Sequence, residues 1–97
     1  VIVDSGSTDK TLHIASSFPA KILHRKFDTY ANQKNYALAH TKYEWVLALD
    51  ADEVVSDGLR EEIIQLFSSS HKLEDSAGFL IPRLTNYMGT WIRYSGF

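Results

Sequence analysis

Short apolar runs alternate along the chain with segments of helical character. Residues 1–4 form an apolar run, residues 21–24 form a second, and residues 45–50 form a third that reads Trp-Val-Leu-Ala-Leu-Asp. Because the third run has no polar alternation, it is typical of a parallel strand that is buried on both faces. Residues 78–84 predict a further strand, which its proline places at a sheet edge or a bulge.

Three segments between these runs have the features of helices. The first extends from about residue 11 to Phe18, can be capped by Ser7 or Thr8, and stops at Pro19. The second covers residues 31–40 and is rich in helix formers and small side chains.

The third helix follows Ser56 as its cap. Its apolar positions recur at the spacing of one buried stripe, with Glu61 and Glu62 left to face water; the stripe consists of Leu59, Ile63, Leu66 and Phe67. The polar residues 68–76 predict a surface loop, and residues 87–91 predict a turn.

Strands that alternate with helices predict an α/β fold with a mostly parallel sheet. Such sheets bind ligands beyond the carboxyl ends of their strands. A length of 97 residues allows one domain at most, and a domain of this size has a small core.

The composition argues against several classes of protein. The hydrophobic fraction of 44% and the charged fraction of 23% are ordinary for a soluble domain, and no run is long enough to cross a membrane. The absence of cysteine excludes disulfides and thiolate metal sites and fits a reducing compartment, so the cytoplasm is the expected location. A net charge of −2 gives no bulk reason to bind nucleic acid.

Acidic side chains follow two of the predicted strands. Asp50 and Asp52 are two positions apart at the end of the third run, so they can face one ligand. Two close carboxylates repel each other unless a cation lies between them, and Mg²⁺ or Mn²⁺ shared with a phosphate is the usual solution. Alternatively, these acids solvate a strand-to-helix turn and cap the next helix. A second acidic turn, at residues 4–9, favours the functional interpretation.

Other α/β domains also gather acids at strand ends. A magnesium-dependent phosphoryl-transfer or receiver-like domain is one such alternative. It would need an aspartate that accepts the phosphate and a lysine after a later strand, and no lysine follows Lys72.

Three stretches together resemble the family 2 glycosyltransferases, inverting enzymes of the GT-A fold: VIVDSGSTDKT, NQKNYALA and VLALDADE. The resemblance covers Val1 to about Arg60, and the tail from Gly78 is similar to the bacterial lipopolysaccharide-core β-glucosyltransferase group. It implies a Rossmann-like three-layer sandwich with a mostly parallel sheet, present here in part. We expect one partial domain over residues 1–97, with residues 1–60 as the nucleotide-sugar-binding half and residues 77–97 as the start of the acceptor side.

The resemblance also assigns roles to the first acidic turn and the second helix. Asp4 would contact the uracil or ribose of the nucleotide-sugar, with Ser5 and Ser7 close by. Lys34 would lie near the diphosphate, and Asn35 would help to fix the nucleotide pocket. The alternatives are an ordinary capping turn for Ser7 and a solvated helix face for Lys34.

The resemblance assigns the remaining roles to residues of the third apolar run and of the tail. Asp50 would contact the ribose and diphosphate, and Asp52 would coordinate the divalent metal. In the tail, Arg83, Trp91 and Arg93 are candidates for the acceptor side, because aromatic faces pack on sugar rings and arginine pairs with phosphates. Alternatively, Trp91 packs in a hairpin core.

The implied reaction is the transfer of a sugar, with inversion, from a nucleotide-sugar, expected to be UDP-linked, to a saccharide or lipid-linked saccharide acceptor. Lipopolysaccharide or other cell-envelope glycan synthesis, at the inner face of a bacterial membrane, is the expected setting. The general base of the family lies downstream of this tail, so the catalytic residue is unknown and the chain by itself is expected to be inactive. The alternative is a fragment that binds a nucleoside diphosphate and metal without chemistry.

The chain starts inside a strand without methionine, which indicates a piece of a longer protein. The resemblance implies that a first strand and the C-terminal part are missing. Since that strand would lie between the runs at residues 1–4 and 45–50, we expect exposed strand edges and a dimer or strand-swapped oligomer.

Overall fold

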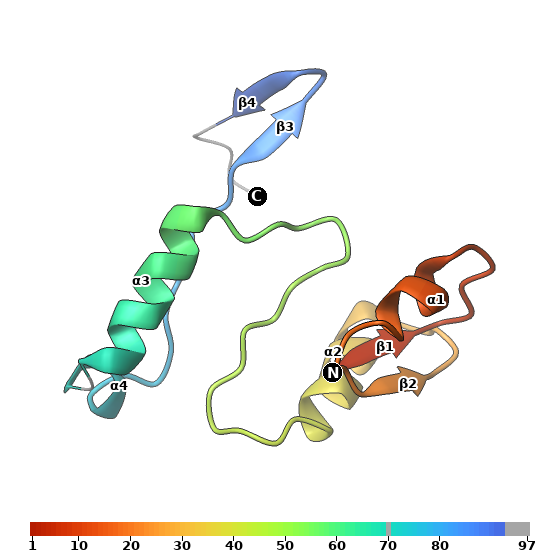
Figure 1. Cartoon of the computed structure of the whole chain (residues 1–97), viewed down its shortest axis with the longest axis horizontal. Coiled ribbons are helices and arrows are strands. Elements are labelled where there is room, and N and C mark those ends of the chain that lie inside the picture. Colours follow the sequence, from red (N-terminus) through yellow and green to blue (C-terminus); the bar gives the residue numbers. More distant parts are fainter. Residues whose placement is uncertain (70, 93–97) are drawn as a thin grey trace. The chain divides into compact units, whose positions relative to one another are not determined.

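The structure, a computed structural model, describes residues 1–69 and 71–92. The chain divides into two compact units, Val1–Ala51 and Asp52–Phe97, called here the first and the second unit (Figure 1). The first unit contains a small parallel sheet and two helices, and the second contains two helices and a hairpin. In the described part of the chain, no helix is both long and apolar enough to cross a membrane.

The first unit is built on two short parallel strands. Strand β1 (Ile2–Asp4) pairs with β2 (Ile22–His24), and helix α1 (Thr11–Ala15) lies between them in the sequence. The register places Asp4 opposite His24, so both strands end at the same edge of the sheet. This confirms the predicted strands at residues 1–4 and 21–24 and their parallel arrangement.

Helix α1 differs from its prediction at both ends. Its N-cap is Lys10, whose side chain makes no capping hydrogen bond, and the helix ends at Ala15 rather than Phe18. The prediction of a Ser7 or Thr8 cap was therefore wrong. The backbone N–H and the hydroxyl of Ser7 both donate to the Asp4 carboxylate instead. A short polar side chain can form either a helix cap or a local turn, and here the turn prevails.

Helix α2 (Tyr30–Ala39) confirms the prediction for residues 31–40. Its N-cap is Thr29, whose hydroxyl accepts a hydrogen bond from the backbone N–H of Asn32 at 3.1 Å. The cap satisfies one of the free N–H groups of the first turn. In Figure 1 this helix lies beside the β1–β2 pair in the first unit.

Residues 45–50 take no regular structure, so the prediction of a buried third strand was wrong. Val46, Leu47 and Leu49 are between 43% and 50% exposed. A run that is apolar on both faces needs neighbouring strands and covering helices. The sheets within the described ranges are β1 with β2 and β3 with β4, and neither includes this run.

The second unit begins with helix α3 (Asp57–Ser68). As predicted, Ser56 caps it, accepting a hydrogen bond from the backbone N–H of Leu59 at 3.2 Å. Leu59, Ile63 and Leu66 are half-buried, whereas Phe67 is 53% exposed, so the predicted stripe is covered only in part.

Two predictions after this helix were wrong. Helix α4 (His71–Glu74) occupies part of the predicted loop at residues 68–76. Residues 78–84, predicted as a strand, are irregular, and the strand that follows, β3 (Thr85–Tyr87), starts only after them. Pro82 has no backbone N–H for a ladder, which weakens strand formation in this stretch.

Strand β3 forms an antiparallel hairpin with β4 (Thr90–Ile92), which confirms the predicted turn. The two connecting residues both have positive φ, 49° at Met88 and 83° at Gly89. Positive φ at both central positions is characteristic of the type I′ turn, whose twist matches that of paired strands.

Few side chains are fully buried in the described residues. Ala15 is 8% exposed and is the buried apolar residue, while Asp4 is 6% exposed and is the buried charged residue. The α/β character and the parallel pairing are therefore present in a small core. The three-layer sandwich stays a prediction.

Candidate functional site

A tight turn at the carboxyl end of β1 is organised around the Asp4 carboxylate. Oδ2 accepts hydrogen bonds from the backbone N–H groups of Gly6 at 2.9 Å and Ser7 at 3.0 Å, and Oδ1 accepts one from the Ser7 hydroxyl. Gly6 has a φ of +104°, which a residue with a Cβ rarely adopts. The buried carboxylate therefore shapes its own loop and holds the backbone of residues 5–7 at the sheet edge.

The turn favours the ionised form of Asp4. Its pKa is lowered first by the Ser7 hydroxyl and then by the backbone N–H groups of Gly6 and Ser7; burial opposes this shift, and His24 adds a smaller lowering. His24 Nδ1 lies 3.9 Å from Asp4 Oδ2 and pairs with it when protonated. The pKa of Asp9 is also lowered, chiefly by the Thr11 hydroxyl. Both acids of this loop remain anionic near neutral pH.

The Ser5 hydroxyl contacts α2. Its hydroxyl oxygen accepts a hydrogen bond from Gln33 Nε2 at 2.8 Å, across 28 positions of sequence. The other end of the Gln33 amide, Oε1, accepts a hydrogen bond from Arg25 Nη1 at 3.2 Å. These contacts connect the loop after β1, the residue after β2 and the first turns of α2.

Arg25 is itself held in place by several neighbours. Its guanidinium forms a two-pronged ion pair with Asp28, with Nη1 2.8 Å from Oδ1 and Nη2 3.2 Å from Oδ2. The cation also lies 5.6 Å from the centre of the Tyr36 ring. Asn32 Nδ2 donates to Asp28 Oδ2 at 2.9 Å, and the pKa of Asp28 is strongly lowered, first by Arg25. The network fixes the start of α2 against the end of β2.

Lys34 and Asp50, predicted from different segments, meet in the first unit. Lys34 Nζ lies 2.9 Å from Asp50 Oδ1, and the two side chains are 54% and 43% exposed. The neighbouring Asn35 on α2 is also exposed. A cation and a carboxylate that both reach solvent can form new contacts with a charged ligand.

The second unit begins with the exposed Asp52. Glu53 forms an ion pair with the predicted acceptor-side residue Arg83, whose Nε is 2.8 Å from Glu53 Oε1. Across residues 1–69 and 71–92, no group of three or more His, Cys, Asp or Glu side chains could hold a metal. The described carboxylates therefore form no complete metal cage of their own.

Trp91, the second acceptor-side candidate, lies on β4 opposite Asn86 and is 60% exposed. This exposure argues against the alternative that Trp91 packs in a hairpin core. Arg93, the third candidate, lies outside the described residues.

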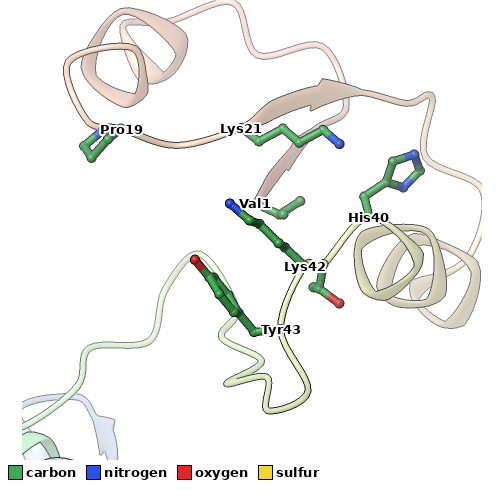
Figure 2. A pocket seen from close by; sticks show the side chains of 7 residues that line it. Val1, Pro19, Lys21, His40, Lys42 and Tyr43 are labelled. Atoms are coloured by element: carbon green, nitrogen blue, oxygen red, sulfur yellow. The ribbon is translucent and has the colours of Figure 1, made fainter.

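The first unit also contains a cavity of about 670 Å³ at the opposite end of its sheet. It is lined by Val1, Pro19, Lys21, His40, Thr41, Lys42 and Tyr43. Figure 2 shows Lys21 in the segment that enters β2 and Lys42 in the segment that leaves α2. None of the predicted site residues lines this cavity, which lies where β1 and β2 begin, whereas the Asp4 turn lies where they end.

Sequence reasoning missed Arg25, Asp28 and Gln33, which form the polar network between β2 and α2. Asp28 and Thr29, in a polar loop directly before a helix, are a capping signal that could have drawn attention to this segment. The pairing of Gln33 with Ser5 had no comparable local signal.

Comparison with known proteins gives a consistent result. The family described as "Glycosyl transferase family 2" matches residues 1–77. An uncharacterized glycosyltransferase of Rickettsia typhi is 37% identical over 89 residues, which cover 92% of this chain and 30% of that protein. A second, from Rickettsia bellii, is 42% identical over 72 residues, covering 74% of this chain and 24% of that protein.

One relative has a more specific name. The lipopolysaccharide core biosynthesis glycosyltransferase LpsC of Rhizobium meliloti is 36% identical over 78 residues, covering 75% of this chain and 29% of LpsC. The chain thus spans less than a third of the length of each of these relatives. No solved structure matches it.

Proposed function

The chain belongs to glycosyl transferase family 2, and from this premise we propose that it carries the donor-binding part of an enzyme that transfers a sugar from a UDP-linked donor to a saccharide acceptor with inversion. The observation that carries the proposal is the ion pair of Lys34 with Asp50. It supplies the cation and the carboxylate that a sugar nucleotide needs for its diphosphate and its ribose.

The residues at the carboxyl ends of β1 and β2 would bind the nucleoside. Open α/β sheets bind ligands at this edge. The Asp4 turn presents the backbone of Gly6 and the hydroxyl of Ser5, which offer close approach and hydrogen bonding to a flat base or a ribose. Asp4 acts here by holding the turn, with Ser7 as its hydroxyl donor.

The diphosphate would bind at Lys34, with Asn35 beside it on α2. A lysine ammonium neutralises phosphate as a compact point charge. Its present partner, Asp50, is solvent-accessible, so the exchange of one anionic partner for another requires little desolvation. The Asp50 carboxylate would accept hydrogen bonds from the ribose.

Asp52 has the chemistry to hold Mg²⁺ or Mn²⁺. Magnesium prefers hard oxygen ligands and is commonly held by one or two carboxylates together with substrate phosphates and water. The exposed Asp52 carboxylate is such a ligand. When bound, the ion would act as a Lewis acid that stabilises the charge developing on the leaving nucleoside diphosphate.

The acceptor is proposed to be a saccharide, or a lipid-linked saccharide, of the bacterial cell envelope. The name of LpsC supports this class. Trp91 offers an exposed aromatic face for a sugar ring, and Arg83 offers a guanidinium, although it now pairs with Glu53. A lipid-linked acceptor would bring the enzyme to the inner face of the cytoplasmic membrane.

Calorimetric titration of UDP, with and without Mn²⁺, tests the donor site. We expect metal-dependent binding that is lost in Asp52→Ala and kept in Asp75→Ala, which removes an exposed carboxylate elsewhere in the second unit. Binding that is the same with and without metal would contradict the metal role. No binding by the unsubstituted chain would contradict the donor site itself.

Turnover separates the enzyme from a binding-only fragment. The assay would follow release of UDP from UDP-glucose in the presence of a lipopolysaccharide-core acceptor. Binding without release is the outcome expected if the general base lies outside this chain, and release would show that these residues suffice for catalysis.

A further inference from the structure

The network between Arg25, Gln33 and Ser5 has a fixed hydrogen-bond direction. A guanidinium carries only donors, so the end of the Gln33 amide that faces Arg25 must be its carbonyl oxygen. The NH₂ end of the amide must then face Ser5, as observed at 2.8 Å. If the amide were reversed, its NH₂ group would face the donors of Arg25 and its carbonyl oxygen would face Ser5.

The orientation of Arg25 is secured independently of Gln33. Asp28 binds both Nη1 and Nη2 of the guanidinium, and the Tyr36 ring lies under its cationic face. A two-pronged pair of this kind fixes the plane of the guanidinium as well as its position. The donor that faces Gln33 Oε1 is therefore part of a rigid assembly.

From this direction we propose that Gln33, oriented by Arg25, is a positioning residue that makes the Ser5 hydroxyl an outward-facing hydrogen-bond donor to the sugar nucleotide. Ser5 Oγ already accepts from Gln33, so its single proton is available to a ligand. Ser5 is exposed at the edge of the sheet where the nucleotide is proposed to bind. This inference rests on the proposed donor site.

The direction determines which hydrogen bond Ser5 can offer to the ligand. Its one proton is not used in the contact with Gln33, so it is available to an acceptor such as a phosphate oxygen or a carbonyl oxygen of a nucleobase. Gln33 occupies one of the two lone pairs of the hydroxyl and does not compete for this proton.

Gln33→Glu reverses the direction while it keeps the side-chain length. A carboxylate accepts from Arg25 as before, but it also accepts the Ser5 proton, so Ser5 presents lone pairs to the ligand instead. We expect UDP to bind about tenfold more weakly, the range associated with losing a hydrogen bond to a charged acceptor. If Gln33 only supported the fold, this variant would keep the Arg25 contact and would weaken UDP binding only through repulsion between the added carboxylate and the diphosphate.

A double-mutant cycle with Ser5→Ala separates the effect of Gln33→Glu on the Ser5 hydroxyl from the effect of the added negative charge. Repulsion between the introduced carboxylate and the diphosphate is present in both backgrounds, whereas the effect on the hydroxyl exists only when Ser5 is present. We expect Gln33→Glu to weaken UDP binding much less in the Ser5→Ala protein. Equal weakening in both backgrounds would overturn the inference.

Titration with uridine in place of UDP distinguishes the two candidate acceptors of the Ser5 proton, an oxygen of the nucleoside and a phosphate oxygen. Weakened binding of uridine by Gln33→Glu identifies an oxygen of the nucleoside. Weakening confined to UDP identifies the phosphate if it is lost in the Ser5→Ala background, and charge repulsion alone if it persists there. The first two results support an outward donor, whereas repulsion alone, or an unchanged affinity for both ligands, would contradict it.

A measurement without ligand tests the Gln33–Ser5 contact independently of the proposed donor site. The side-chain amide resonances of Gln33 should shift in Ser5→Ala, while those of Gln65, an exposed glutamine on α3, should not. An unchanged Gln33 resonance would overturn the relay even if UDP binds. Failure of the unsubstituted chain to bind UDP would instead overturn the donor site.

Discussion

Lys34 Nζ lies 2.9 Å from Asp50 Oδ1, so a helix and an irregular segment that follows it are joined by one ion pair in the first unit. Because both side chains are about half exposed, the pair contributes less than about 1 kcal/mol to stability. The ion pair therefore positions the two charges more than it stabilises the fold. It keeps a cation and a carboxylate together at the surface, where a ligand with opposite charges can separate them.

Replacing this cation should affect binding far more than folding. We expect Lys34→Met to weaken UDP binding about tenfold, the size of a charge-assisted contact to phosphate. The slope of affinity against salt concentration should also become shallower, measured by calorimetry between low and high salt. Lys72→Met, on α4 of the second unit, is the control and should leave both quantities unchanged. Equal losses in the two variants would contradict a specific role for Lys34.

The Asp4 turn should respond to acid in a predictable direction. The folded pKa of Asp4 lies below its usual value of about 3.9. The carboxylate therefore stabilises the turn above about pH 4, and this contribution is lost as the pH falls through the folded pKa. Ser7→Ala removes the largest cause of the shift, so the midpoint of the Asp4 carboxyl titration by ¹³C NMR should rise. Ser5→Ala should leave this midpoint in place, since the Ser5 hydroxyl bonds to Gln33.

Local signals predicted the elements whose stability is local. Ser56 identified the start of α3, and the composition of residues 31–40 identified α2. The prediction failed where structure depends on partners distant in sequence. Residues 45–50 have the composition of a buried strand, but a strand needs a neighbour for its backbone groups, and no described strand pairs with them.

The Ser56 cap gives a test of local helix stability. Ser56→Ala should cost about 1 kcal/mol at the start of α3, because it removes the acceptor for the Leu59 N–H. Amide hydrogen exchange should then be about fivefold faster in the first turn of the helix. Ser69→Ala removes a hydroxyl contact at the other end of the helix and should leave the first turn unaffected. The same acceleration in both variants would mean that the whole helix opens as a unit.

One substitution should stabilise the turn of the β3–β4 hairpin. Met88 has a left-handed φ of 49°, which is unfavourable for a side chain without local hydrogen-bonding groups. Asn-Gly is the preferred pair for this turn, so Met88→Asn should stabilise the hairpin by about 1 kcal/mol. Gly89→Ala should destabilise it, because Gly89 has a φ of 83°. Cross-strand contacts between Asn86 and Trp91, observed by NMR, report both effects, and the opposite ranking would contradict the turn geometry.

The candidate site was accessible to sequence reasoning only in part. Asp4, Lys34 and Asp50 were predicted through motifs, and the structure brings Lys34 and Asp50 into contact. Gln33 was not identified, because its partner Ser5 is 28 residues away and neither side chain has an unusual local context. A relay of hydrogen bonds is a property of three-dimensional neighbours, and no periodicity in the chain encodes it.

The exposed run at residues 45–49 has a practical consequence for the chain in solution. It is apolar and lacks charge and proline, and three of its side chains are 43–50% exposed. Exposed segments with these properties are an aggregation hazard, because they are able to stack with other chains as cross-β strands. We therefore expect the run to limit the concentration and the storage time over which the chain resists aggregation. We expect Ala48→Lys, which adds a gatekeeper charge, to extend both.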